Sequence, residues 1–138
     1  MNHDELQQQT NAHYEDFPFD FLTEEDEQNI EQLQPPAFFR FTETYLRPGS
    51  KVAEIGCGPG RATLFMSNRG IDLLAVDISP ASLSLAKRRA PNCKFLQATN
   101  LDLPLPDEAF DAVVSDGVIH HTPDAYTSFC ENARILRP

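Results

Sequence analysis

The segment of this sequence that is richest in groups for ligand binding runs from Glu54 to Gly60. It reads Glu-Ile-Gly-Cys-Gly-Pro-Gly, after a short apolar run and directly before a helix-like segment. Glycine permits backbone conformations, and a close ligand approach, that a Cβ atom would block. The N-terminus of a following helix adds unpaired N–H donors and a partial positive charge. We therefore expect a binding loop here, the alternative being a tight turn without a ligand.

The glycine spacing discriminates between nucleotide ligands. A nicotinamide or flavin fingerprint places its third glycine five positions after the first. Arg61 stands at that position, the third glycine is Gly60, and Glu54 precedes the first glycine by two residues. The pattern therefore argues against a dinucleotide.

A second acidic residue follows the next apolar run. Asp77 ends the strand-like segment 71–76 and lies 21 residues after Gly56. A carboxylate at this place can accept charge-assisted hydrogen bonds from both hydroxyls of a ribose. The alternative is an acid that only caps the following helix.

The pattern Glu54-x-Gly56-x-Gly58-x-Gly60 resembles the nucleotide-binding loop of the class I S-adenosylmethionine-dependent methyltransferases. Further segments match the family in the same order, and the last of them resembles its lead-in to a fifth strand. These segments are 95–104, 110–115, 115–124 and 134–138. The resemblance covers residues 50–138 and implies S-adenosylmethionine as the cofactor.

The resemblance also implies roles for single residues. The glycine loop with Glu54 would seat the methionine part of the cofactor and Asp77 the ribose, while Thr99 or Asn100 would contact the adenine. Thr99 stands where the family commonly has an acid, and the alternative for both residues is a plain polar loop. The residues expected at the cofactor are Tyr14, Glu54, Gly56, Cys57, Gly58, Gly60, Asp77, Ile78, Thr99, Asn100 and Ser115.

Two candidates lie outside the glycine loop. His121 matches a histidine that the family often has near the transferring methyl group, and it is the candidate catalytic base; the alternative is a histidine that caps the last helix. No metal is expected, because no third ligand has a recognisable spacing from His120 and His121. Tyr14 lies in an acidic arm that would form a lid over the cofactor or fix the arm to the core.

The charge of the chain is distributed unevenly. Of its 138 residues, 21 are acidic and 11 are Lys or Arg, giving a net charge of −10. Residues 1–39 hold ten acids and no Lys or Arg, so the remainder is neutral. A nucleic-acid partner is not expected, because a protein that binds nucleic acid neutralises its phosphates with Lys and Arg side chains. The acidic arm is interpreted as a solvated helical face.

The apolar runs, the first residues and the cysteines indicate the cellular compartment of the protein. No apolar run approaches the ~20 residues of a membrane helix, and no secretory signal is present, so no membrane partner is expected. The three cysteines lack a CxxC spacing and suit reduced thiols. We expect a cytoplasmic location.

Alternating helices and strands must position these residues. Strands are expected over 51–55, 71–76, 94–97 and 110–115, and helices over 24–34, 37–45, 61–69, 80–89 and 122–136. This alternation predicts an α/β fold, a Rossmann-like parallel sheet of about four strands with helices on both faces. Residues 1–50 would form an acidic helical extension, and 51–138 the amino-terminal part of a cofactor-binding domain.

The resemblance implies a methyltransferase that acts on a small-molecule acceptor. The alternatives are a methyltransferase acting on RNA or protein and a non-catalytic cofactor-binding or scaffold fragment. Family members continue with strands five to seven, which are expected to be missing here. Strand 110–115 would then leave an open apolar edge, and this predicts self-association.

Overall fold

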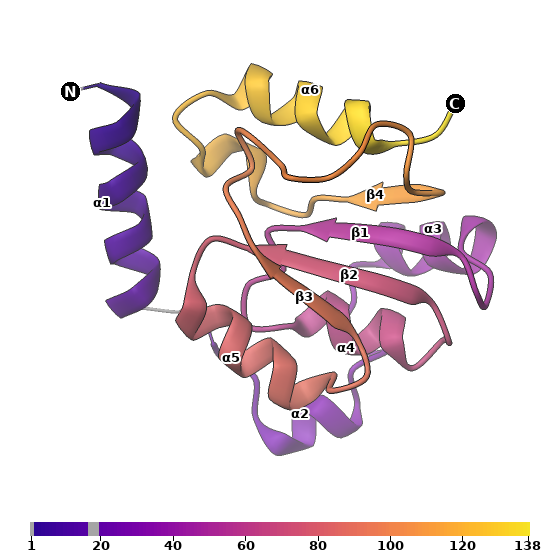
Figure 1. Ribbon diagram of the computed structural model, residues 1–138. Helices are drawn as coiled ribbons and strands as arrows, with labels where there is room; N and C mark the ends of the chain where they lie inside the picture. Colours follow the sequence, from indigo (N-terminus) through magenta and orange to yellow (C-terminus); the bar gives the residue numbers. More distant parts are fainter. Residues whose placement is uncertain (1, 17–19) are drawn as a thin grey trace.

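The computed structural model of the protein describes residues 2–16 and 20–138, except for the side chains of His3 and Tyr14. A parallel sheet of four strands in the order β3-β2-β1-β4 forms its centre (Figure 1). The strands are β1 (Lys51–Ile55), β2 (Asp72–Asp77), β3 (Lys94–Gln97) and β4 (Ala112–Val114). The predicted α/β fold with a four-stranded parallel sheet is confirmed.

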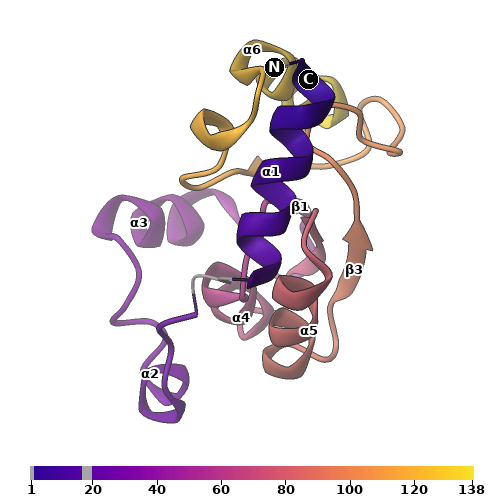
Figure 2. The same cartoon turned by 90° about the vertical axis from the view of Figure 1, so that its left-hand side faces the viewer.

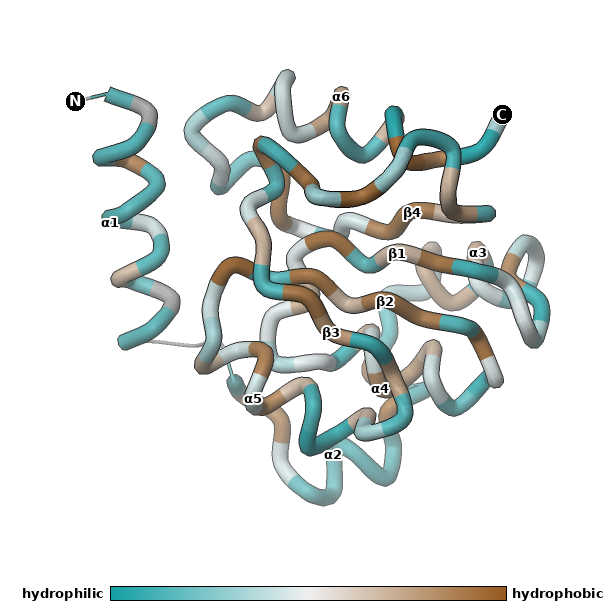
Figure 3. Tube along the Cα trace, viewed as in Figure 1, coloured by the Kyte–Doolittle hydropathy of each residue, from teal (hydrophilic) through white to brown (hydrophobic). Residues whose placement is uncertain are grey.

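Helices cover both faces of the sheet, as predicted. On one face, Leu73 packs in a core with Phe65 of α4 (Arg61–Ser67), and Ala75 packs against Ala86 of α5 (Pro80–Arg89). On the other face, Val76 belongs to a core with Ile135 of α6 (Ala125–Ile135). Strands buried on both faces need near-continuous apolar runs, and these runs are the brown centre of Figure 3.

The N-terminal residues form three helices outside the sheet: α1 (His3–Asp16), α2 (Glu24–Gln28) and α3 (Pro36–Tyr45). Helix α1 stands across the edge at which β1 and β2 end (Figures 1 and 2). Near its last turn, the Glu15 Oε1 accepts a hydrogen bond of 3.3 Å from the backbone N–H of Ala81, at the start of α5. No helix among the described residues is long and apolar enough to cross a membrane.

Helix boundaries follow the capping residues. Ser79 caps α5 as expected, its hydroxyl accepting a hydrogen bond from the backbone N–H of Ser82 at 3.1 Å. Thr23 and Asp26 form a capping box at the start of α2. This helix ends at Gln28, and the prediction that it continues to residue 34 was wrong. The Asn29 side chain donates to the Glu25 carbonyl oxygen at 2.9 Å and competes with the helical backbone.

The last strand and helix also differ from expectation. Strand β4 covers only 112–114, and Phe110 instead pairs in parallel with Leu136. Helix α6 begins after Asp124, whose carboxylate accepts a hydrogen bond from the backbone N–H of Thr127 at 2.9 Å, and a short 3₁₀ helix, η1 (Ile119–His121), precedes it. Leu136 therefore lies beside the start of β4, where the resemblance placed the lead-in to another strand.

The interpretation of the acidic arm as a solvated face is only partly right. Arg69 of the segment after α4 forms ion pairs of 3.0 Å with Glu31 and with Glu43. Arg61, at the start of α4, donates a hydrogen bond of 2.7 Å to Gln34 Oε1. The N-terminal layer, defined here as residues 20–45, is therefore bound to the sheet domain through arginine side chains.

Candidate functional site

A cavity of about 440 Å³ opens at the edge where the strands end. The loops after all four strands contribute to its lining, because the carboxyl ends of parallel strands lie at one edge. Helix α1 contributes Gln7 and Thr10, and the N-terminal layer contributes Phe21 and Leu22. The cavity therefore has a floor made by the sheet domain and walls made partly by the N-terminal residues.

The glycine loop forms the floor of this cavity. The backbone N–H groups of Gly56 and Cys57 donate to the Val76 carbonyl oxygen, at 2.7 and 2.9 Å, and fix the loop to β2. Gly56 has φ +79°, and a Cβ atom there would lie 2.4 Å from a methyl carbon of Val118. Gly58 has φ +52°, and a Cβ atom there would meet nothing within 4 Å. Open space thus lies beside the loop where a ligand would approach.

Gly60 does not line the cavity. It has φ +97°, and an added Cβ atom would lie 2.8 Å from the Cα atom of Ala86 in α5. We predicted Gly60 as a cofactor residue from its spacing. The structure places it where the loop packs against α5, so its direct role is to bring these two elements together.

Glu54 lies at the end of β1 and lines the cavity with only 4% of its surface exposed. The Thr63 hydroxyl of α4 donates to Glu54 Oε2 at 2.6 Å. Burial raises the pKa of the Glu54 carboxyl to about 8, although the Thr63 hydrogen bond opposes this shift. Cys57, beside it, is buried, and burial raises the pKa of its thiol well above the ordinary range. It is therefore a neutral thiol and no nucleophile.

Asp77 performs a structural task in the place expected for a ribose ligand. Its Oδ2 accepts a hydrogen bond of 2.8 Å from the backbone N–H of Gly58, and its Oδ1 accepts one of 3.0 Å from that of Ser79. Burial raises the pKa of the Asp77 carboxyl, and the backbone donors oppose this shift. Asp77 also lines the cavity, as does Ile78. Each carboxylate oxygen has a second lone pair, so bracing the loop leaves acceptor capacity for a ligand.

The structure separates Thr99 from Asn100. Asn100 is buried and lines the cavity, while Thr99 does not line it. The Thr99 hydroxyl oxygen accepts a hydrogen bond of 3.2 Å from the backbone N–H of Leu101. Of the two alternatives, only Asn100 is placed to meet a ligand.

Ser115 does not line this cavity. Ser115 lines a separate groove with Pro35 and Phe38, and its buried hydroxyl has no hydrogen-bond partner among the described residues. The Tyr14 side chain lies outside the described residues. Gln7 and Thr10 of the same helix line the cavity, and the lid role of Tyr14 stays a prediction.

His121 lies at the exposed rim of the cavity in η1. Its backbone N–H donates to the Val118 carbonyl oxygen at 2.9 Å, and its ring lies 4.0 Å from that of His120, between centroids. The alternative role of capping the last helix is taken by Asp124. Among the described residues, no cluster of three side chains could hold a metal ion.

Sequence reasoning missed several residues that line the cavity. Arg61 forms an ion pair of 2.7 Å with Asp116 of the loop after β4, so two sides of the cavity are joined. The signal was present, because Arg61 follows the last glycine directly. Gln7 and Thr10 carried no recognisable motif.

Residues 53–138 match the model of the methyltransferase domain family. The chain belongs to this family. A demethylmenaquinone methyltransferase of Tropheryma whipplei is 34% identical over 95 residues, which are 65% of this methyltransferase chain and 38% of that protein. A Mus musculus protein named "Probable tRNA methyltransferase 9B" is 37% identical over 95 residues, which are 67% of this chain and 20% of that protein. The chain therefore spans less than half the length of either relative.

Solved structures show the same relationship. An S-adenosylmethionine-dependent methyltransferase of Thermotoga maritima matches with a TM-score of 0.66 and 25% identity, over 93% of this chain and 57% of that one. The YcgJ protein of Bacillus subtilis matches with a TM-score of 0.64 and 25% identity, over 80% of this chain and 47% of that one.

The cavity of this methyltransferase domain fits the cofactor of the family, S-adenosylmethionine. Its volume lies within the ~300–1,000 Å³ typical of small-molecule sites. Open space at Gly58 leaves room beside the backbone, and the carboxyls of Glu54 and Asp77 and the amide of Asn100 line the same space. The carboxyl of Glu54 suits an ammonium group, that of Asp77 a pair of hydroxyls, and the amide of Asn100 an adenine amino group.

Proposed function

We propose that this chain binds S-adenosylmethionine in the cavity and serves in methyl transfer to a small-molecule acceptor. The observation that carries the proposal is the convergence of Glu54, Asp77 and Asn100 around the loop of Gly56 and Gly58 in one cavity. These residues are widely separated in the sequence, and together they offer carboxyl and amide oxygens as acceptors within one cavity.

In this proposal the protein acts mainly by positioning. The bound cofactor supplies a sulfonium methyl group that is already activated for transfer. Holding two reactants in line contributes roughly 7–11 kcal/mol to lowering the barrier. Glu54 and the glycine loop would orient the methionine part, Asp77 the ribose and Asn100 the adenine.

His121 would act at the acceptor side. Its place at the exposed rim suits a general base for an acceptor whose nucleophilic atom carries a proton. Phe21 and Leu22 line the cavity, as do Gln7 and Thr10 of α1, and these side chains would exclude water from the reacting groups.

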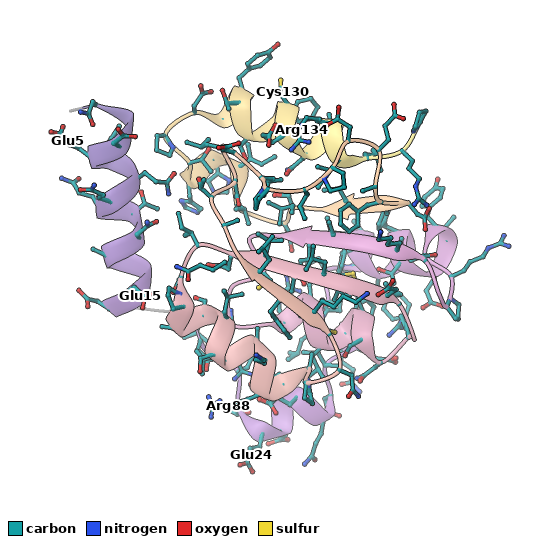
Figure 4. All side chains as sticks on the ribbon, in the orientation of Figure 1. Glu5, Glu15, Glu24, Arg88, Cys130 and Arg134 are labelled. Atoms are coloured by element: carbon teal, nitrogen blue, oxygen red, sulfur yellow. The ribbon has the colours of Figure 1, made fainter. Side chains whose placement is uncertain are left out.

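A small-molecule acceptor is favoured by charge and by one group of relatives. The ten acids of residues 1–39 include Glu5 and Glu15 of α1 (Figure 4), the helix that contributes Gln7 and Thr10 to the cavity. The negative charge of these acids would repel the phosphate backbone of a nucleic acid. The Tropheryma whipplei relative is named for demethylmenaquinone, which is neither a nucleic acid nor a protein.

A second candidate is a tRNA acceptor. It is favoured by the mouse relative, whose name refers to tRNA and which is 37% identical over 95 residues. The charge of the N-terminal residues argues against it, so it stands behind the small-molecule proposal.

Titration calorimetry with S-adenosylhomocysteine, S-adenosylmethionine and NAD tests the cofactor. We expect saturable binding of the first two and none of NAD, because Arg61 replaces the third dinucleotide glycine; NAD binding without the others would overturn the proposal. Methyl transfer from labelled S-adenosylmethionine into a cell extract then tests the acceptor. Label in low-mass material supports the proposal, nuclease-sensitive label would favour the tRNA candidate, and binding without any transfer would indicate a scaffold.

A further inference from the structure

Arg89, the last residue of α5, joins two parts of the molecule that are far apart in sequence. Its side chain is only 7% exposed. Its Nη1 donates to the Pro59 carbonyl oxygen, inside the glycine loop, at 2.7 Å. It also forms ion pairs with Glu27 at 2.7 Å and with Asp20 at 2.9 Å, both in the N-terminal layer.

The chemistry of a buried guanidinium makes these contacts interdependent. A guanidinium withdrawn from water requires partners for its fixed planar set of donors, and removal of one partner leaves charge uncompensated. The partners of Arg89 come from both the loop and the 20–28 segment. The position of Pro59 is therefore linked to the docking of Asp20 and Glu27.

Both linked parts border the cavity, although Arg89 itself does not. On one side, Gly58 and Pro59 belong to the floor; on the other, Phe21 and Leu22 lie directly after Asp20. The Leu22 carbonyl oxygen also accepts a hydrogen bond from Arg89, at 3.4 Å.

We propose that Arg89 is a positioning residue that couples the glycine loop to the 20–28 segment, so that ligand binding and docking of this segment strengthen each other. The inference rests on the proposed function in placing the cofactor in this cavity. Coupling between two sites is reciprocal in binding free energy. A ligand on the loop should therefore hold the segment, and a docked segment should raise ligand affinity.

The first test removes one charge without touching the cavity. Glu27→Gln and Asp20→Asn should each lower the affinity for S-adenosylhomocysteine about fivefold or more, as for a typical coupling. Glu24→Gln is the matched control, because Glu24 lies on the same helix and projects away from the body (Figure 4). Equal affinities in Glu27→Gln and Glu24→Gln would overturn the coupling.

The second test uses the arginine. Arg89→Met should lose affinity and Arg89→Lys should recover part of it, while Arg88→Met, on the exposed neighbour labelled in Figure 4, should not change it. Arg69→Met is a further control: Arg69 also forms ion pairs with two acids of the N-terminal layer, at 3.0 Å, but among the described residues it has no hydrogen bond or ion pair with the glycine loop. An equal loss of affinity in Arg69→Met would show general loosening of the layer and overturn a specific role for Arg89.

Hydrogen exchange separates this inference from the proposed function. In ligand-free protein, Glu27→Gln should speed amide exchange in residues 56–60, and Glu24→Gln should not. If wild type fails to bind S-adenosylhomocysteine, the proposed function fails, and this ligand-free comparison still decides whether Arg89 transmits docking to the loop. Unchanged exchange in residues 56–60 would overturn the link between Arg89 and the loop. The exchange measurement on Glu27→Gln also detects coupling if Arg89→Met is too unstable to assay.

Discussion

At the scale of single residues, Glu54 is the group whose charge depends most on what fills the cavity. Its buried carboxyl has a pKa of about 8 in the ligand-free chain, so it is largely protonated at neutral pH. A ligand ammonium beside it would favour the ionised form and lower this pKa.

We therefore predict that binding of S-adenosylhomocysteine releases a proton at pH 7. Its affinity should rise with pH by up to about tenfold per unit and level off above the ligand-free pKa of about 8. Calorimetry in buffers of different ionisation enthalpy measures the proton directly. Glu54→Gln should bind more weakly and without this proton release; an unaltered pH profile in that variant would refute the assignment.

Asp77→Ala should weaken S-adenosylhomocysteine binding far more than His121→Ala. Loss of one or two charge-assisted hydrogen bonds costs roughly 1.5–4 kcal/mol, about tenfold to several-hundredfold in affinity. Because Asp77 also accepts hydrogen bonds from Gly58 and Ser79, its variant should melt at a lower temperature as well. Titration of both variants beside their melting curves checks this. Equal affinities would mean that the ribose assignment is wrong.

Residue spacing predicted the loop but not which way each residue faces. Glu54 and Asp77 lie in the last residues of their strands and Gly58 in the loop after β1, and the carboxyl ends of parallel strands meet at one edge, so their place at the cavity followed from topology. Gly60 and Ser115 carried the same kind of signal. Their surroundings depend on how closely α5 and α3 pack, which no local pattern encodes.

At the scale of elements, the contact between the glycine loop and α5 separates two glycines that look alike in sequence. Gly60→Ala should lower the melting temperature more than Gly58→Ala, because its Cβ atom would lie 2.8 Å from the Ala86 backbone. The Cβ atom of Gly58→Ala would lie in open space, so this variant loses only the free energy of backbone strain at positive φ, about 1–2 kcal/mol. Calorimetric melting of both variants decides this, and equal losses would count against the close packing.

The same open space makes Gly58 the better probe of ligand binding. Gly58→Val should leave a folded chain that no longer binds S-adenosylhomocysteine, because the branched side chain would occupy space beside the cavity. Circular dichroism confirms folding and calorimetry measures binding. Unchanged affinity would show that the loop is only a turn.

Most elements of the sheet domain were predictable, and α1 was not. The ranges 51–55 and 94–97 are confirmed residue for residue, because apolar runs bounded by turn residues define strands well. Helix α1 lacks an apolar stripe, so periodicity gave no signal. Its start is marked by reciprocal hydrogen bonds of Asn2 and Glu5, at 2.8 and 2.9 Å, a pair whose spacing is visible in the sequence.

At the scale of the whole molecule, β4 is an edge strand in the described chain. The backbone of a parallel strand alternates between its two sides: the Asp111 N–H donates to the Lys51 carbonyl oxygen of β1, whereas Phe110 bonds to Ile135 and Arg137 on the other side. Within β4, the backbone groups of Ala112 and Val114 therefore face the edge that no described strand covers. We predict concentration-dependent self-association of the 138-residue chain, measured by analytical ultracentrifugation. Ala112→Pro should reduce it, since proline removes a backbone donor that faces this edge. A monodisperse monomer at high concentration would contradict the prediction.

The ion pairs of Arg89 have a consequence for biosynthesis. Asp20 and Arg89 are 69 positions apart, so at about 5–20 residues per second the ribosome adds the arginine roughly 3–14 s after the acid. During that interval Asp20 and Glu27 lack the guanidinium that pairs with them in the folded chain, and the 20–28 segment has too few apolar side chains to collapse alone. Its docking therefore belongs to the late steps of assembly, when β1, β2 and the glycine loop have already been synthesised. The nascent chain therefore contains the glycine loop before the 20–28 segment can dock beside it.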